Sequence, residues 1–544
     1  MEAIRDAVAR AALGLGAPPD FAPVLERPRD PAFGEWTTNA ALVLAKPLAR
    51  KPRELAQALI DTMNLGDAGV SGAEIAGPGF INFRLDPAAV TRGLGAVLAG
   101  GEQYGRGTAR AGEQVVVEFV SANPTGPLHV GHGRQAALGD SIATLLEWEG
   151  ARVSREFYYN DAGVQIQNLG LSVQARLAER AGRGGALPEG GYHGEYIREI
   201  AERYAGAHAD DAAGADLARV TAFAVRELRT EQDLDLQAFG VRFDTYFLES
   251  SLYTDGRVQE TVQALDGAGM AYEHEGALWL RTTAFGDDKD RVMRKRDGTF
   301  TYFVPDVAYH VTKWKRGFRR AVNVQGADHH STVTRVRAGL QALRMGVPEG
   351  YPEYVLHQMV TVMRGGEEVK ISKRAGSYVT VRDLIDEVGR DAVRFFFLMR
   401  QGDSHLKFDV DLAKAQSEEN PVYYIQMQHA RMYGIFRNGG VDPAAITADG
   451  VDLSALREPE ELELIKALLD FPALVAAAAD ALEPHRVTAY VLDTARKAST
   501  WYHKHHVLDE PEPILRARLV LARAAQLVIR NALALLGIHA PERM

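Results

Sequence analysis

Residues 121–134 read S-A-N-P-T-G-P-L-H-V-G-H-G-R, and they lie between an apolar run at 115–120 and a helical pattern at 134–148. A second apolar run, 154–159, follows that helical pattern. Strand, helix and strand at this spacing predict the βαβ unit of a parallel sheet, which binds ligands at the carboxyl ends of its strands. The stretch therefore predicts a Rossmann-like α/β domain with its chemistry in the turn after the first strand.

Two histidines and two glycines occupy the start of the predicted helix. His129 and His132 are three residues apart, and Gly131 and Gly133 are expected to leave the backbone open to a nucleotide. Free N–H groups and the helix dipole favour phosphate here, and the imidazoles can donate hydrogen bonds to it. The stretch is neither a P-loop nor a G-x-G-x-x-G fingerprint. The alternative is a zinc ion shared by the two histidines, but no third ligand lies nearby in sequence.

A second cationic motif lies far along the chain. Residues 370–374 read K-I-S-K-R, with Gly365 and Gly366 before them. Two ammonium groups on a short loop can close over the phosphates of ATP. A lone lysine pair is typical of solvated surface charge, whereas its occurrence together with H-V-G-H favours a catalytic role.

Both motifs resemble the signature motifs of class I aminoacyl-tRNA synthetases, and residues 121–134 resemble the arginyl form of the first. Many arginyl enzymes lack the first lysine of the second motif, whereas Lys370 is present here. The resemblance spans nearly the whole chain and includes the terminal P-E-R-M. Further matching stretches are N-D-A-G-V-Q-I (160–166), F-G-V-R-F-D (239–244), D-K-D-R-V (288–292), G-A-D-H-H (326–330) and D-A-V-R-F (391–395).

The resemblance implies ligation of arginine to the terminal adenosine of tRNA(Arg). The arginine carboxylate attacks the α-phosphate of ATP, pyrophosphate leaves, and a ribose hydroxyl then takes the arginyl group. The expected substrates are ATP, with Mg²⁺ on its phosphates, L-arginine and tRNA(Arg), without a structural zinc. The implied catalytic residues are His129, His132, Lys370 and Lys373, and the implied ATP-binding residues are Pro124, Thr125, Gly126, Gly131, Gly133, Asp328, His329 and Ser372.

Selectivity for arginine requires carboxylates, because a guanidinium offers a planar fork of donors to a carboxylate. The resemblance places Tyr302 and Asp306 around the side chain, and Glu118, Ser121 and Asn123 around the polar ends, with Gln325 as a further candidate. Lysine would leave part of such a site unpaired, which can discriminate by about 10⁴-fold. No editing domain is therefore expected.

Three units are predicted: an N-terminal α+β module at 1–110, the catalytic domain at 111–410 with an insertion at about 180–290, and a helical anticodon-binding bundle at 411–544. A second half of the catalytic sheet is expected to include strands at 300–303 and 322–324. In the first unit a strand at 80–85 presents alternate residues on an open face, which suits an unstacked base. The predicted tRNA-binding residues are Phe80, Asn82, Tyr423, Gln428, Arg431 and Trp501, and for each aromatic the alternative is packing in the core.

Composition limits the classes of protein to which this chain can belong. The chain has 544 residues, no cysteine and a net charge of −10, so disulfides are excluded and RNA binding must be local. Candidate basic clusters lie at 46–53, 291–296, 313–320 and 496–504, where solvated surface charge is the alternative. Neither a signal peptide nor a membrane span is predicted. A cytoplasmic monomer is expected.

Two rival functions remain. A non-catalytic, tRNA-binding relative would keep the fold, but H-V-G-H, K-I-S-K-R, Asn123, Tyr302 and Asp306 are all intact. Another enzyme of the superfamily would be a cysteinyl synthetase or a small nucleotidylyltransferase. The first normally needs a cysteine-bound zinc, and the second lacks a C-terminal helical domain.

Overall fold

Five parallel strands form the central sheet of the computed structural model, which describes residues 2–28, 30–369 and 378–544. The strand order is β12-β11-β5-β6-β7. β5, the first of these five strands in chain order, lies in the middle, and the order reverses between β5 and β11. Open α/β sheets bind ligands at such a reversal. The strands are β5 (Gln114–Glu118), β6 (Arg152–Tyr159), β7 (Thr245–Leu248), β11 (Arg320–Gly326) and β12 (Glu353–His357).

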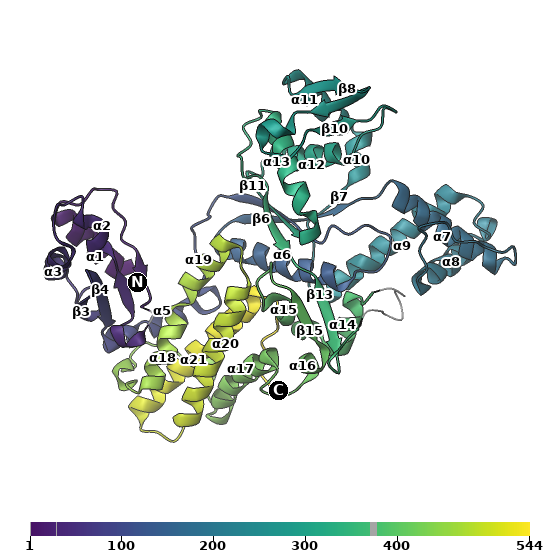
Figure 1. Ribbon diagram of the computed structural model, residues 1–544. Coiled ribbons are helices and arrows are strands. Elements are labelled where there is room, and N and C mark those ends of the chain that lie inside the picture. The colour runs from purple at the N-terminus through teal and green to yellow at the C-terminus, as the bar shows by residue number, and fades with distance from the viewer. Residues whose placement is uncertain (1, 29, 370–377) are drawn as a thin grey trace.

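Helices cover both faces of this sheet, as its apolar strands require. Val115 and Val117 pack into the core on the side of α6 (Val130–Trp148), whereas Val116 packs into the core on the side of α12 (Phe303–Lys315). Figure 1 shows α6 below the sheet and α12 above it. The predicted Rossmann-like domain is confirmed. The helices α10 (Glu249–Thr254), α11 (Arg257–Gly267) and α13 (His330–Ala342) lie on the side of α12.

The region predicted as one insertion at about 180–290 contains a strand of the central sheet. β7 pairs in parallel with β6 and separates two excursions. The first is a helical lobe with its own core, at the right of Figure 1. It contains α7 (Val164–Arg180), α8 (Glu195–Ala207), η3 (Ala209–Asp211) and α9 (Leu217–Ala238).

The second excursion carries a three-stranded antiparallel sheet, above the central sheet in Figure 1. Its elements are β8 (Ala271–His274), β9 (Ala277–Leu280), η4 (Thr282–Phe285) and β10 (Arg291–Arg294). The strand predicted at 300–303 is wrong, because Phe300 forms only an isolated bridge to Arg294 and α12 begins at Phe303. The strand predicted at 322–324 lies within β11.

A buried arginine joins the helix α6 to the chain that follows the central sheet. The Arg134 guanidinium donates to the carbonyl oxygens of Gln358 (2.8 Å), Ser404 (3.0 Å) and Gln401 (3.0 Å). This tie positions the start of α6 against a small sheet of order β14-β13-β15. The short helix η5 (Ala327–His329) lies between β11 and α13. The elements after β12 are β13 (Val360–Arg364), β14 (Glu367–Glu368), α14 (Val381–Val388), α15 (Arg390–Leu398), β15 (Leu406–Asp409) and α16 (Val410–Lys414).

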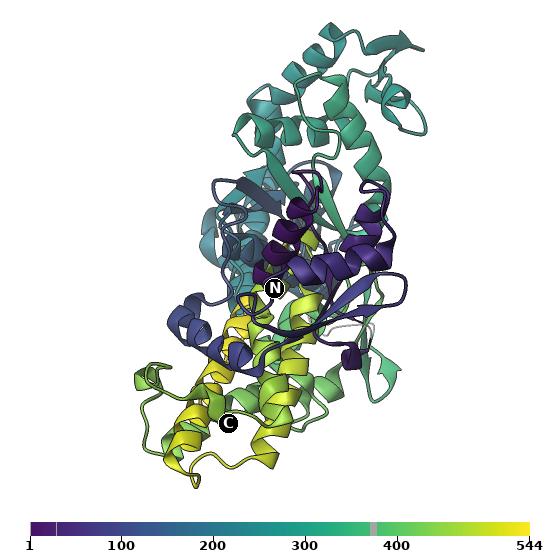
Figure 2. The same ribbon diagram turned by 90° about the vertical axis from the view of Figure 1, so that its left-hand side faces the viewer.

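The N-terminal module packs against the C-terminal helical bundle (Figure 2). Lys466 pairs with Glu35 at 2.5 Å, and Arg27 pairs with Asp470. The module contains α1 (Glu2–Gly14), β1 (Leu25–Glu26), η1 (Pro31–Phe33), β2 (Trp36–Thr38), α2 (Ala40–Ala45), α3 (Pro52–Thr62), β3 (Val70–Ala76) and β4 (Phe80–Leu85), followed by α4 (Pro87–Arg92), α5 (Leu94–Gly100) and η2 (Gly101–Gln103). The bundle contains α17 (Pro421–Asn438), η6 (Pro443–Ala445), η7 (Leu453–Ala455), α18 (Pro459–Leu469), α19 (Phe471–Ala481), α20 (His485–Lys504) and α21 (Glu512–Leu535). Among the helices of the described chain, none is both long and apolar enough to cross a lipid bilayer.

Candidate active site

The two histidines of the first motif cap α6 for each other. The backbone N–H of His132 donates to His129 Nδ1 (3.2 Å), and the N–H of His129 donates to His132 Nδ1 (3.3 Å). Their rings stack with centroids 3.6 Å apart. Because each Nδ1 accepts, we infer that each ring is neutral and carries its proton on Nε2. Burial lowers the pKa of both histidines, which keeps them neutral, so both Nε2–H groups are available as donors.

The glycines of this motif make room for neighbouring side chains of the protein. A Cβ on Gly131 would lie 2.8 Å from Cε1 of His129, and one on Gly133 would lie 2.7 Å from Cγ2 of Val381. That Gly131 and Gly133 also bind ATP stays a prediction. Gly131 permits the stacked position of His129, and Gly133 permits the close packing of α6.

Strained backbone follows β5, the central strand of the sheet. Val120 and Ser121 have φ of +69° and +43°, a region that residues other than glycine rarely adopt. The Ser121 hydroxyl holds this turn, since it donates to Glu118 Oε1 (3.0 Å) and accepts from the N–H of Tyr158 (3.2 Å). Ser121 thus joins the ends of β5 and β6.

Glu118 already has a cation from the protein. Lys313 on α12 is fully buried and places Nζ 2.5 Å from Glu118 Oε2 and 3.1 Å from Asn323 Oδ1. In the next strand Glu156 accepts from Tyr309 (2.7 Å) and Arg316 (2.5 Å). Lys313 is therefore a buried ion-pair partner, so the basic cluster predicted at 313–320 is not wholly a surface patch.

A second group of acidic side chains lies beside this network without such a partner. Among the described residues, no lysine or arginine forms an ion pair with Asp306 on α12 or Glu249 on α10. Burial raises the pKa of Asp306 to about 7; Arg335 lowers it, and the neighbouring charges of Glu249 and Glu118 raise it. Burial also raises the pKa of Glu249, which accepts from the Tyr158 hydroxyl at 2.8 Å. Crowded carboxylates of this kind form a site that a guanidinium would relieve.

Sequence reasoning had identified Asp306 but missed Glu249, Tyr158 and Lys313. Glu249 directly follows β7, and Tyr158 lies near the end of β6, so both stand where parallel strands present ligand groups. That rule would have found Tyr158 from the predicted strand at 154–159, and Glu249 if residues 245–248 had been recognised as a strand of the central sheet.

The other residues predicted around arginine lie in different settings. Asn123 donates to Gln165 Oε1 at 2.6 Å. Tyr302 is 74% exposed at the start of α12. Gln325 lies at the end of β11, and its buried Oε1 meets no donor within the described chain.

A cavity of about 540 Å³, here called the switch-point cavity, lies where the strand order reverses. The histidine pair forms one wall, and the ends of β11 and β12 form another. Asp328 also lines it, whereas Lys370, Ser372, Lys373 and the side chain of His329 lie outside the described residues. The further lining residues include Gly131, Gln135, Gly326, Ala327, His357, Gln358, Met359, Val360, Tyr378 and Val379.

The chain matches three family models that together span most of its length. The model described as "tRNA synthetases class I (R), catalytic domain" matches residues 94–188 and 214–414. "Arginyl tRNA synthetase N terminal domain" matches residues 1–85, and "DALR anticodon binding domain" matches residues 425–544. The chain is 56% identical to an arginine–tRNA ligase of Bordetella petrii, over 96% of this chain and 95% of that one.

This chain belongs to the arginyl-tRNA synthetase family.

Other members agree with this placement. An arginine–tRNA ligase of Geobacter metallireducens is 55% identical over 96% of this chain and 95% of its own length. The fold is similar to that of Thermus thermophilus arginyl-tRNA synthetase, with a TM-score of 0.79, 24% identity and full coverage of both chains. Arginyl-tRNA synthetase from Plasmodium falciparum gives a TM-score of 0.78 at 16% identity, over 100% of this chain and 99% of that one.

The residues predicted to contact tRNA in this family member differ in exposure. Phe80 is 37% exposed on β4, and Tyr423 and Arg431 are partly exposed on α17. Asn82 is only 6% exposed. Gln428 and Trp501 have no exposed surface, so they cannot contact RNA in this conformation. For these two, packing in the core replaces the predicted contact.

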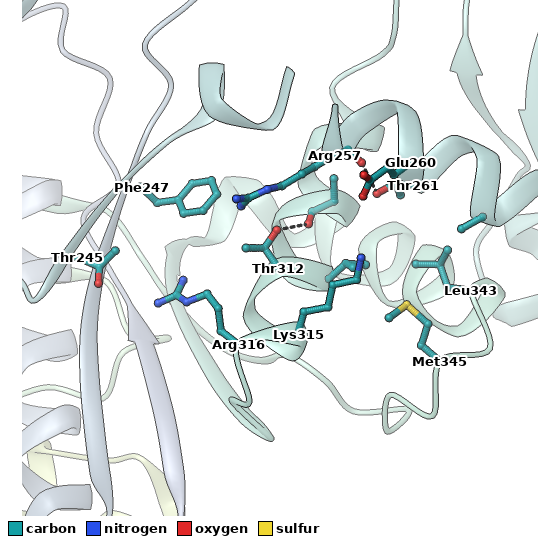
Figure 3. A pocket seen from close by; sticks show the side chains of 13 residues that line it. Thr245, Phe247, Arg257, Glu260, Thr261, Thr312, Lys315, Arg316, Leu343 and Met345 are labelled. Carbon is teal, nitrogen blue, oxygen red and sulfur yellow. Dashed lines mark hydrogen bonds between the residues drawn. The ribbon is translucent and has the colours of Figure 1, made fainter. Parts of the chain in front are cut away.

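A cavity larger than the switch-point cavity lies away from the histidine pair. It has a volume of about 830 Å³ and borders Ala308, Val311, Thr312 and Lys315, which lie on the face of α12 opposite Asp306 and Lys313. Figure 3 shows Arg257, Lys315 and Arg316 around this cavity. Neither histidine of the first motif lines it, so the size of a cavity alone does not identify the active site.

Proposed function

We propose that this protein uses ATP to ligate L-arginine to the 3′-terminal adenosine of tRNA(Arg), through an arginyl-adenylate, with release of AMP and pyrophosphate. The observation that carries the proposal is the pairing of an acidic pocket, Asp306 with Glu249, with two neutral histidines that cap α6. Family membership supports the same reaction.

Arginine recognition rests on the two carboxylates. A guanidinium between Asp306 and Glu249 would return the raised pKa of Asp306 toward its ordinary value, so binding is linked to ionisation of this group. A lysine ammonium offers one compact charge and cannot fill the same bidentate geometry. Ser121, Asn123 and Gln325 are proposed for the polar end of the substrate, with Tyr302 at the rim. Since the Glu118 carboxylate is bound to Lys313 and Ser121, we assign it a positioning role.

Activation of arginine needs in-line placement and donors around the α-phosphate. The Nε2–H groups of His129 and His132 are proposed to donate there, with the nucleoside in the switch-point cavity. From the motif alone, Lys370 and Lys373 are proposed to bind phosphate. Mg²⁺ is proposed to be carried mainly by the ATP phosphates, because this ion keeps several of its waters and binds substrate phosphates. Its chemistry is neutralisation of phosphate charge.

The three predicted units take separate parts in this proposal: 111–410 performs the chemistry, 411–544 binds the anticodon, and 1–110 contacts another part of the tRNA. Phe80, Tyr423 and Arg431 are the exposed candidates for these contacts. A base can stack on an aromatic ring or a guanidinium. We further propose a monomer that acts in the cytoplasm.

Charging of tRNA tests the function directly. Purified protein is incubated with ATP, unfractionated tRNA and each radiolabelled amino acid in turn, and acid-precipitable label is counted. Label from arginine alone is the expected result. Charging by another amino acid, or none with any of them, would reject the proposal.

A further inference from the structure

The cavity of about 830 Å³ beside α12, here called the back cavity, has an apolar floor. Its side chains come from β7, from α12 and from the segment that follows α13. Phe247, Ala308, Val311 and Leu343 are all buried there, and Met345 is partly buried. The volume lies in the range that encloses a small organic molecule, and such a floor suits the hydrocarbon part of one.

Three cationic side chains line the same cavity. Arg257 begins α11, Lys315 is the last residue of α12, and Arg316 directly follows it. Figure 3 shows Arg257 on the α11 side of the cavity, and Lys315 and Arg316 on the α12 side. The exposed Glu260 is the one acidic residue of the lining. The cavity therefore presents a positive rim above an apolar floor.

The fixed partners of these cations lie outside the cavity. Arg257 pairs with Asp255 at 3.1 Å, and Arg316 pairs with Glu156 at 2.5 Å. Neither carboxylate lines the cavity. Lys315 is exposed and forms no ion pair with any residue of the described chain. An anion inside the cavity would thus meet cations whose own carboxylates lie elsewhere.

Aromatic rings separate the back cavity from the acidic pocket of Asp306 and Glu249. The Phe247 ring lies 6.0 Å from that of Tyr158 and 4.8 Å from that of Tyr309, measured between centroids. The Tyr158 hydroxyl in turn donates to Glu249 at 2.8 Å. Neither Asp306 nor Glu249 lines the back cavity. The two sites are therefore neighbours of opposite charge, and the back cavity is not part of the arginine pocket.

We propose that the back cavity binds a small aromatic anion, such as an aryl carboxylate or sulfonate, which takes no part in the ligation reaction. Its charged group meets Arg257 and Lys315, and its ring packs on Phe247 and the rest of the floor. A phosphate backbone would use the cations and leave the floor empty, and a neutral apolar molecule would use only the floor. An aromatic anion uses both, and its ring can also stack on a guanidinium.

The test uses 8-anilinonaphthalene-1-sulfonate, which fluoresces when its rings leave water. The full chain is titrated with this probe and with N-phenyl-1-naphthylamine, which has the same rings without the sulfonate. Lys315→Gln and Arg257→Gln each remove a contact to a charged group, so the Kd of the sulfonate should rise about tenfold. The Kd of the neutral amine should not change. Lys289→Gln is the matched control, an exposed lysine that does not line the cavity.

A filling variant tests the floor independently of charge. Ala264 is an exposed residue of α11 that lines the cavity, so Ala264→Trp should occupy the space with little effect on the fold. Both probes should then bind at least about tenfold more weakly. The urea midpoint of unfolding, expected to be unchanged, shows that the variant is folded.

Three results would overturn the inference. The sulfonate may give no saturable signal, or its Kd may be the same in all three cavity variants, and then the cavity does not bind it. If tRNA displaces the sulfonate and Lys315→Gln raises the KM for tRNA, the cations bind RNA instead. The binding assays do not depend on the charging of arginine, so this inference and the proposed function fail separately.

Discussion

Two pairs of carboxylates lie near the carboxyl end of the central sheet, and they differ in whether the protein supplies a cation. Glu118 and Glu156 are register neighbours on β5 and β6, bound to Lys313 and Arg316. For Asp306 and Glu249 no ion pair with lysine or arginine occurs in the described part of the chain. The helix α12 carries both Lys313 and Asp306, and Arg316 directly follows it. One segment of the chain therefore builds a neutralised network next to a site that still needs a cation.

The difference separates carboxylates that support the fold from carboxylates that recognise the substrate. A buried carboxylate is stable when a cation and hydrogen bonds satisfy it, and the first pair meets that condition. In the second pair like charges and burial raise the pKa of Asp306 to about 7. A site for a cationic substrate must leave its acids unneutralised, and stability is lost as a result.

Lys313→Met should give the largest effect, because it leaves Glu118 buried without its cation. Breaking a buried pair costs about 3–5 kcal/mol, which should appear as a lower urea midpoint of unfolding. The double variant Lys313→Met with Glu118→Gln is the control and should recover much of the loss. A change below about 1 kcal/mol in the single variant would show that solvent compensates the carboxylate.

Asp306→Asn should act on the substrate instead. An amide cannot supply the charge-assisted, bidentate contact, so the KM for arginine should rise about 100-fold with little change for ATP. Asp255→Asn is a suitable control, because Asp255 is an exposed aspartate at the end of α10 that pairs with Arg257. An arginine KM within about threefold of the unchanged enzyme would remove Asp306 from the pocket.

The sequence predicts well those parts that local patterns specify. Residues 115–120 and 154–159 are apolar, and a glycine-rich turn with a helical pattern lies between them, so the first βαβ unit follows from spacing. Residues 300–303 carry Phe300, Tyr302 and Phe303, which have strand propensity, yet Pro305 in the first turn of α12 is compatible with a helix start. The four residues of β7 are too few to give a periodic signal.

The site is less predictable where it depends on contacts between distant residues. Lys313 is 195 residues from Glu118 and lies in a basic run that resembles a surface cluster. Glu249 joins Asp306 only because β7 returns to the central sheet. Resemblance to a family identifies the residues of the motifs. The residues that neutralise or crowd them are known only from the packing of the folded chain.

The pH dependence of arginine binding should distinguish the two pairs further. Asp306 is mostly ionised above its pKa of about 7 and mostly protonated below it. The KM for arginine should therefore rise up to about tenfold per unit of falling pH below about 7, and stay level above it. Burial lowers the pKa of both rings of the histidine pair, so they take up protons at a lower pH than free histidine does. In Asp306→Asn the rise should disappear, and a flat profile in the unchanged enzyme would contradict the assignment.

The smallest effect should be a gain of stability in Asp306→Asn, opposite in sign to that of Lys313→Met. The pKa of Asp306 is raised on folding, so its ionised form destabilises the fold as pH rises toward 7, and the cost is fully present above that value. Because Asp306 is only partly buried, solvent screens this cost, and about 1 kcal/mol is expected near pH 8. Urea unfolding near pH 8 and near pH 5 measures it, and the gain should shrink at the lower pH because protonated Asp306 is neutral like asparagine. A loss of stability at both pH values would mean that Asp306 is held by the fold, as Glu118 is, and that the contrast between the two pairs is false.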